Sequence, residues 1–299
     1  MKLLIFCAVS LLAGACATLS KTQIESVNQF AKCSNDFSAF PSGIMTELAN
    51  IRTIRGVWYA NSLTIPKNHI DILDSVYFNS THAYKLSEKS DITFRVIDKY
   101  AKSLALLSSD RYENEFVKQT EGFGVSLDTL IKRYNRIDNS RALPVGIGAA
   151  AGKLVIMGGR QYIRSKQARE IKKFVPQADT LVAIMTSNLL QFLKSENIDE
   201  LIMAEEFGIN QNYLSYIRQS HGTSPQDDFQ YLGLKTRLDG VKQLRDKTIT
   251  ATKSMRKAHG ELLESIQKKR NLVESLQGIK EMAEQVRDLK NTIDKIEKP

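Results

Sequence analysis

Residues 241–262 read VKQLRDKTITATKSMRKAHGEL, and this stretch decides the fold. Its apolar and small residues recur at alternating spacings of three and four, which is typical of a helix that packs along one narrow stripe. The members of the stripe are Val241, Leu244, Thr248, Ala251, Met255, Ala258 and Leu262. The pattern predicts a long amphipathic helix rather than a strand, whose side chains would alternate with a period of two.

The same register continues toward the C-terminus, with Lys269 and Lys290 at two positions of the stripe. The continuing apolar members are Ile266, Val273, Leu276, Ala283, Val286, Ile293 and Ile296. One helix over about residues 228–298 would be about 100 Å long. We therefore expect an elongated molecule in which earlier helices pack antiparallel against this one. Self-association of the long helix as a coiled coil is the alternative.

Upstream of this stretch the helical period recurs, and strand-like alternation is nearly absent. One stripe holds Ile44, Leu48, Ile51 and Trp58, a second Leu86, Thr93, Ile97, Tyr100, Leu104 and Leu107, and a third Leu181, Ile184, Met185, Asn188, Leu189 and Phe192. Turn-forming residues indicate breaks at 41–43, Pro66, 122–124, 138–140, Pro176 and 222–225. The sequence predicts an all-α fold, an elongated antiparallel helical bundle with a long C-terminal coiled-coil-like helix.

A connection at 136–144 divides the predicted helices into two portions. We expect an N-terminal helical bundle portion at 16–140. Residues 141–299 would then hold an apolar and basic helix, a core helix and the long C-terminal helix, and the two portions can form one domain. The chain has 299 residues, with 42% hydrophobic and 25% charged. These proportions are ordinary for a globular protein, and they exclude collagen-like and disulfide-rich classes.

The first residues have the pattern of a secretory signal peptide. Lys2 precedes the mainly apolar run 3–12, which is shorter than the about 20 residues that a membrane span needs. Small residues and Cys16 follow. The run Leu12-Ala13-Gly14-Ala15-Cys16 resembles the lipobox of bacterial lipoproteins, although Ala13 stands where that family usually has Leu, Val or Ile. The resemblance covers only the leader.

Membership of that family implies removal of residues 1–15 and a lipid attached to Cys16. It also implies anchoring in a bacterial cell envelope, and Ala17 after the cysteine favours the periplasmic face of the outer membrane. Cleavage at an A-x-A site with soluble secretion is the alternative. Cys7 leaves with the leader, so the mature chain keeps Cys33 as its other cysteine. Cys33 lies on an apolar helical face with Phe30 and Phe37, which favours a buried structural cysteine.

Residues 142–175 are the unusual internal region. Eighteen weakly polar residues, ALPVGIGAAAGKLVIMGG, precede a basic helix. Its candidate membrane- or partner-contacting residues are Lys153, Arg160, Arg164, Lys166, Arg169, Lys172 and Lys173. Close helix packing through the small residues is our first interpretation, and insertion into or docking on a membrane is the second. A phosphate-binding loop is excluded because the spacing of Gly148, Gly152 and Lys153 is one residue short and no hydroxyl residue follows.

The net charge of +9 suggests an acidic partner. Residues 153–173 hold seven basic and one acidic residue, and residues 235–299 hold sixteen and ten. Such surfaces suit anionic lipid or another acidic envelope polymer. No recognised nucleic-acid module is present, so we expect no nucleic-acid partner.

A search for catalytic or metal motifs gives none. His69, His82, His221 and His259 lack metal-site spacing. Ser220, His221 and Ser224 fit a polar turn, and Arg52 and Arg55 stand at cation–π spacing from Trp58. The adjacent pairs Glu205-Glu206 and Asp227-Asp228 point about 100° apart on a helix, unlike a glycosidase couple.

We therefore expect a non-enzymatic envelope scaffold or protein-interaction component without cofactors, whose partners are the bilayer and an unknown envelope protein. The alternative is a membrane-active, pore-forming-like helical protein that uses residues 142–175.

Overall fold

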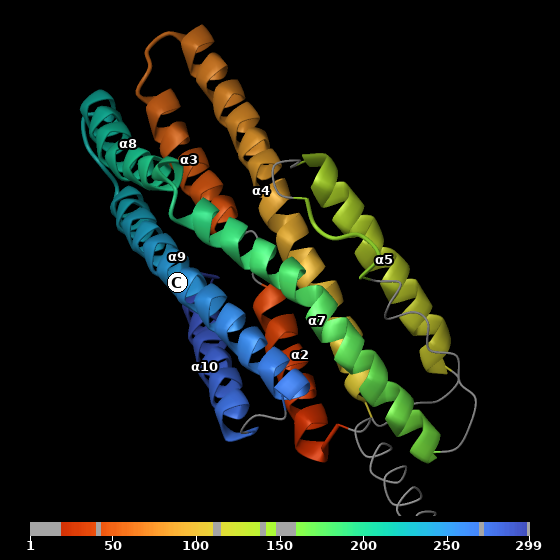
Figure 1. Ribbon diagram of the computed structural model, residues 1–299. Helices are drawn as coiled ribbons and strands as arrows, with labels where there is room; N and C mark the ends of the chain where they lie inside the picture. The colour runs from red at the N-terminus through yellow and green to blue at the C-terminus, as the bar shows by residue number, and fades with distance from the viewer. Residues whose placement is uncertain are drawn as a thin grey trace, which may run out of the picture. The chain divides into compact units, whose positions relative to one another are not determined.

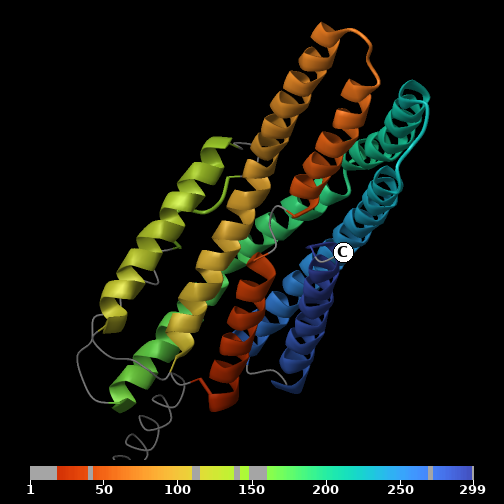
Figure 2. The same ribbon diagram turned by 180° about the vertical axis from the view of Figure 1, so that it is seen from behind.

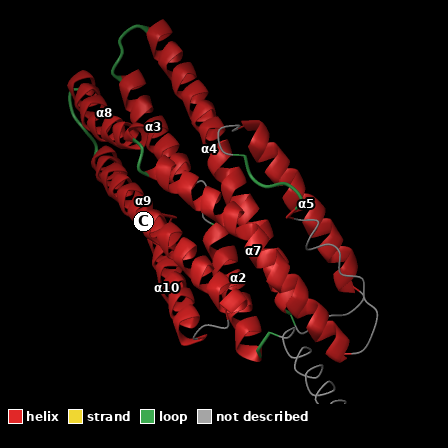
Figure 3. Cartoon of the chain, in the orientation of Figure 1, coloured by secondary structure: helices red, strands yellow, loops and turns green. Residues whose placement is uncertain are grey.

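The computed structural model describes residues 19–39, 43–109, 115–137, 142–147, 160–268 and 272–297. Within these ranges the regular structure is α-helical and no strand occurs (Figure 3). The prediction of an all-α fold is confirmed. The side chains of 79–90, 115–124, 160–166, 268, 272–275 and 297 lie outside the description.

Long helices make up the fold (Figure 1). They are α2 (Lys21–Ser38), α3 (Gly43–Asn61), α4 (Pro66–Ser108), α5 (Glu115–Ile137), α7 (Arg160–Leu193), α8 (Glu196–Ser220), α9 (Pro225–Lys268) and α10 (Leu272–Glu297). They build two compact units. Unit 1 draws on Met1–Ala39, Arg95–Met185 and Ser254–Ala283, and unit 2 on Phe40–Phe94, Thr186–Lys253 and Glu284–Pro299. Each unit contains residues from both sides of the connection at 136–144.

The C-terminal stretch forms two helices, α9 and α10, so the expected single helix over about 228–298 is wrong. In unit 1, Lys257 Nζ lies 2.6 Å from Glu281 Oε2, and in unit 2 Lys247 Nζ lies 3.3 Å from Asp288 Oδ2. Numbers that rise along α9 meet numbers that fall along α10, so the pair is antiparallel within each unit. Both views of the ribbon show α10 beside α9 (Figures 1 and 2).

The stripe of residues 241–262 is buried at every predicted position, and so is Ile266. In α10 the buried positions are Ile279, Met282, Val286 and Leu289. Of the predicted stripe members described there, only Val286 is buried; Leu276, Ala283, Ile293 and Ile296 are half-buried and Lys290 is exposed, so the predicted register is wrong in α10. Lys269 lies outside the described residues.

Several predicted helix boundaries are present, whereas two predicted breaks lie inside helices. Pro66 and Pro225 are the first residues of α4 and α9, where a missing N–H costs no helical hydrogen bond. Pro176, however, lies within α7, and residues 122–124 lie within α5. A proline inside a helix costs about 3 kcal/mol. Burial of its neighbours Phe174, Val175 and Ala178 offsets that cost.

In unit 1, α2 is stabilised at its first turn by a capping box and along its length by buried apolar side chains. Ser20 Oγ accepts a hydrogen bond from the Gln23 amide while Gln23 Oε1 accepts one from the Ser20 amide, which forms a capping box. Gln23 Nε2 then donates to the Ser265 carbonyl of α9 at 2.7 Å. Val27, Phe30 and Phe37 are fully buried on the same helix.

The core of unit 2 is built around the contact of α3 with α8. Ile44, Leu48, Ile51 and Trp58 are all buried, as their helical spacing predicts. This contact determines which side of α8 is available to solvent.

Candidate functional site

Helix α8 has one buried apolar face and one exposed apolar face. Ile198, Ile202, Ile209 and Tyr213 are buried against unit 2. Met203, Phe207 and Leu214 are 65%, 67% and 39% exposed. At about 100° per residue, these three lie within about 40° of one another, and their centre is about 130° around the helix from that of the buried set. We call Met203, Phe207 and Leu214 the α8 stripe.

A buried ion triad holds α8 against α3. Glu205, which is fully buried, accepts hydrogen bonds from Arg52 Nε at 2.6 Å and from Arg55 Nε at 2.5 Å. Gly208 makes this approach feasible, because a Cβ atom there would lie 2.5 Å from the Arg55 guanidinium carbon. Charge-assisted hydrogen bonds of this kind are strong and directional. The bonds between Glu205 and the two arginines of α3 therefore set the rotation of α8 and the direction in which the α8 stripe points.

Further bonds in unit 2 position both ends of α8. Asn212 Nδ2 donates to the Arg55 carbonyl at 3.0 Å. Arg245 of α9 donates to the Leu193 carbonyl at 2.6 Å and to Asp199. Arg237 of α9 pairs with Glu47 of α3. Helices α3, α8 and α9 thus form a cross-braced platform.

Aromatic rings pack at the junction of α8 with α9. The Tyr213 ring lies 4.8 Å from the Trp58 ring and stacks on Tyr231 at 4.7 Å. The Tyr213 hydroxyl donates to Asp228. Burial, followed by this bond to a carboxylate, raises the pKa of Tyr213 far above its usual value. The hydroxyl therefore stays a donor, and the junction is rigid.

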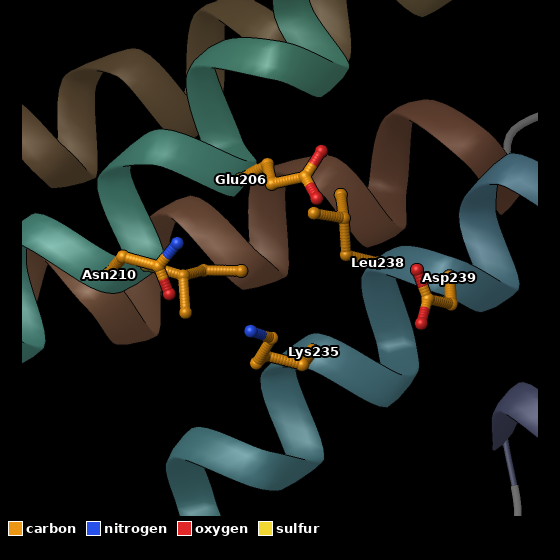
Figure 4. Close-up of a pocket in the computed structure, with 6 residues that line it drawn as sticks. Glu206, Asn210, Lys235, Leu238 and Asp239 are labelled. Carbon is orange, nitrogen blue, oxygen red and sulfur yellow. The ribbon is translucent and has the colours of Figure 1, made fainter.

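A small pocket opens between α8 and α9 within unit 2 (Figure 4). Its lining residues are Glu206, Ile209, Asn210, Lys235, Leu238 and Asp239. Its volume of about 20 Å³ holds about one water molecule. Leu232 of α9 is 56% exposed, so exposed apolar residues occur on both helices that form the pocket.

Carboxylates are numerous near the pocket, but several have basic partners outside α8: Glu205 pairs with Arg52 and Arg55, Asp199 with Arg245, and both Glu206 and Asp239 with Lys242. Residues 196–239 contain eight acidic and three basic residues. Glu206 pairs with Lys242 at 3.0 Å. Glu196 and Glu200 are exposed, and neither forms an ion pair with any described residue. Apolar side chains and uncompensated carboxylates therefore share this face of α8.

Unit 1 contains a different polar cluster, which runs from two buried side chains to two partly exposed ones. The Tyr100 hydroxyl lies 2.8 Å from His259 Nε2, and His259 Nδ1 lies 3.1 Å from Asp179 Oδ1. Arg256 donates to the same carboxylate at 2.6 Å. Tyr100 and His259 are completely buried.

The directions of the pKa shifts indicate which side chains of this cluster carry a proton and which carry a charge. The hydrogen bond from His259 is the largest cause that lowers the pKa of Asp179, and Arg256 adds to it. Burial lowers the pKa of His259 and raises that of Tyr100. An ionised Asp179 accepts the Nδ1 proton, so Nε2 accepts the Tyr100 proton. Neutral imidazole satisfies both neighbours.

The structure describes the side chains of only three of the predicted contact residues. Cys16 and Lys153 lie outside the described residues, and so do the side chains of Arg160, Arg164 and Lys166, whose backbone belongs to α7. Arg169 and Lys173 are exposed, while Lys172 is half-buried. Lys173 lies 3.6 Å from Glu170.

Several side chains take structural roles that the sequence pattern did not assign. Arg52 and Arg55 bind Glu205, and the Trp58 ring packs on Tyr213 instead. Ser224 caps α9, with reciprocal bonds to Asp227. Cys33 is half-buried rather than buried, and burial raises the pKa of its thiol, which disfavours the reactive thiolate.

Two searches of the described residues give negative results. None of the helices there combines the length and apolar character that crossing a bilayer requires. No group of three or more His, Cys, Asp or Glu side chains in those ranges is arranged to hold a metal ion.

Comparison with known protein-family models, curated proteins and solved structures finds no match to this chain. The α8 stripe with its pocket and acidic border is the candidate site on which a functional proposal can be based.

Proposed function

We propose that this protein is a non-enzymatic helical scaffold of a bacterial cell envelope, anchored in the membrane through a lipid on Cys16. In this proposal the periplasmic face of the outer membrane is its location, and an envelope protein is its partner. The observation that carries the proposal is the α8 stripe. Large apolar side chains on the solvent side of a helix that is packed and ion-paired on another side are typical of a surface that another molecule covers.

The cross-braced platform supports this function physically. A scaffold needs a surface that keeps its shape before its partner arrives, because ordering a mobile surface lowers affinity. Glu205 fixes α8 to two arginines of α3, and Arg245 ties α9 to the start of α8. The leader motif Leu12-Ala13-Gly14-Ala15-Cys16 supplies the location.

Two experiments test the two parts of the proposal. Labelled palmitate should enter the wild-type chain in bacteria, whereas Cys16→Ser should remove the label and release the protein from membranes. A photocrosslinking residue at position 207 should capture a discrete envelope protein in living cells, and one at Phe78 of α4, which is equally exposed, should not. Absence of label from the wild type refutes the anchor. Equal crosslinking from both positions refutes the scaffold.

The membrane-active alternative has one observation in its favour, the exposure of Arg169 and Lys173 on α7. Two basic side chains in solvent suit anionic headgroups. A leaderless Cys16→Ser chain should bind anionic vesicles if this alternative holds, and deletion of residues 143–159 should abolish that binding. Failure of the leaderless chain to bind leaves the scaffold as the proposal.

A further inference from the structure

The α8 stripe and the neighbouring part of α9 offer a surface of helix-binding dimensions. Met203 and Leu214 are separated by eleven residues, or about 16 Å of helix. Phe207 lies between them, and the pocket at Glu206 and Asn210 opens beside it toward α9. Apolar anchors about one turn apart on a partner helix would meet such a surface, which is how amphipathic helices bind grooves.

The charge around this surface selects the partner. Glu196 and Glu200 stand exposed beside the stripe, and neither forms an ion pair with a described residue. Acidic side chains near an apolar contact attract lysine and arginine and repel acidic partners. An anionic lipid surface is disfavoured for the same reason.

We propose that the α8–α9 surface of unit 2 binds an amphipathic helix of a protein partner whose apolar face is bordered by lysine and arginine. The inference rests on the proposed scaffold function and names the chemical class of its partner. The α8 stripe receives the apolar face of that helix, and Glu196 and Glu200 pair with its basic border. Lys235, which lines the pocket, has its Nζ 5.4 Å from the centroid of the Tyr231 ring.

Two designed peptides of about 18 residues, or five helical turns, provide the probes. Both carry leucines at helical spacing, one with a lysine border and the other with a glutamate border. Fluorescence anisotropy with the full chain should show that the lysine peptide binds at least about tenfold more tightly. Its affinity should fall as salt rises from about 0.05 M to about 0.5 M, because salt screens exposed charges.

Variants with matched controls identify the surface. Phe207→Ser should weaken the lysine peptide about tenfold, as loss of a central apolar anchor does. Phe78→Ser removes an equally exposed phenylalanine, 68% against 67%, and should leave affinity unchanged. Glu200→Lys should also weaken binding, whereas Asp71→Lys, an exposed change on α4, should not.

Equal affinity for the two peptides overturns the inference, as does a Phe207→Ser protein that binds like the wild type. A wild-type dimer in sedimentation that Phe207→Ser dissociates also overturns it, because a second copy would then be the occupant. The scaffold proposal fails separately. If the peptide binds as expected but no crosslink forms in cells, the scaffold is refuted while the surface chemistry stands. If native complexes form and survive Phe207→Ser, only this inference is refuted.

Discussion

The two units bury polar side chains in different ways. Unit 1 encloses Tyr100, His259 and Asp179, and the completely buried member at the centre of that chain is a neutral imidazole. Unit 2 encloses Glu205 between two arginines, so its centre is an ion triad. An imidazole titrates near neutral pH, and burial lowers the pKa of His259. Mild acid should therefore weaken unit 1 through this side chain.

The units also differ in the apolar surface that they expose. Most of the large exposed hydrophobic side chains described belong to unit 2. They are Val57, Tyr59, Ile65, Ile70, Tyr77, Phe78, Met203, Phe207, Leu214, Phe229 and Leu232. Val125 and Val145 are those of unit 1. Unit 2 combines a buried carboxylate held by two arginines with an exposed apolar face, which suits a platform for a partner.

Removing the charge of Glu205 should have the largest effect on stability, and it tests the ion triad that distinguishes unit 2 from unit 1. Glu205→Gln should lower the free energy of unfolding by about 3 kcal/mol, because two arginines lose the buried carboxylate that compensates them. The adjacent change Glu206→Gln affects an exposed pair with Lys242 and should cost less than about 1 kcal/mol. Urea unfolding measures both. Similar losses for the two variants would contradict the role of the triad.

The polar chain of unit 1 should be less costly to interrupt. Tyr100→Phe leaves His259 Nε2 buried without its donor and should lower the free energy of unfolding by about 1.5 kcal/mol. Tyr59→Phe, at a 40% exposed ring, is the control and should change little. Thermal and urea unfolding provide the measurement. A Tyr100→Phe protein as stable as the wild type would show that the bond contributes nothing.

The titration of His259 should make the free energy of unfolding depend on pH, which is a further test of the polar cluster in unit 1. Its folded pKa lies below 6.5 because of burial, so the unfolded chain takes up this proton at higher pH than the folded protein does. The stabilisation is complete above pH 6.5 and declines as pH falls from 6.5 toward the folded pKa. Asp179, whose pKa is lowered from 3.8, adds a decline only in stronger acid.

His259→Gln should flatten this decline, because glutamine can accept from Tyr100 and donate to Asp179 without titrating. Urea midpoints between about pH 5 and 7 measure the slope, a range that includes the usual histidine pKa. His221→Gln, in the exposed turn before α9, is the control. A slope that persists in His259→Gln would assign the pH response to another group.

The smallest expected effect concerns the α8 stripe itself. Phe207→Ser should change the free energy of unfolding by less than about 0.5 kcal/mol, because the ring is mostly in solvent. Thermal unfolding checks this value. A larger loss would mean that Phe207 belongs to the core of unit 2 rather than to a binding surface.

Helical periodicity predicted much of the core but not the path of the chain. Every stripe residue from Val241 to Leu262 is buried. The pattern of α9 is satisfied whether the chain continues straight or folds back, but in α10 the buried face is Ile279, Met282, Val286 and Leu289, and Val286 is its one member from the predicted stripe. The segment Lys268-Lys269-Arg270-Asn271 contains neither glycine nor proline, so no strong turn signal marked the change of direction.

The candidate site was only partly visible in the sequence. The sequence indicates that Glu205 and Glu206 point in different directions on a helix. The partners of Glu205, however, are Arg52 and Arg55, about 150 residues away. Contacts over such distances depend on tertiary packing, which single-sequence periodicity does not encode. Met203, Phe207 and Leu214 fit a helical face, yet the sequence alone cannot distinguish a second apolar face from a wider core.

The antiparallel pairing of distant segments has a consequence for folding order. Tyr213 and Asp228 are 15 residues apart, so the turn from α8 to α9 can close early. Gln23 meets Ser265, 242 residues later. At about 5–20 residues per second, synthesis separates the two by roughly 12–50 s. Until then Phe30 of α2 lacks its native contact with the His259 ring. Nascent chains should therefore depend on a holding chaperone until their last quarter is made.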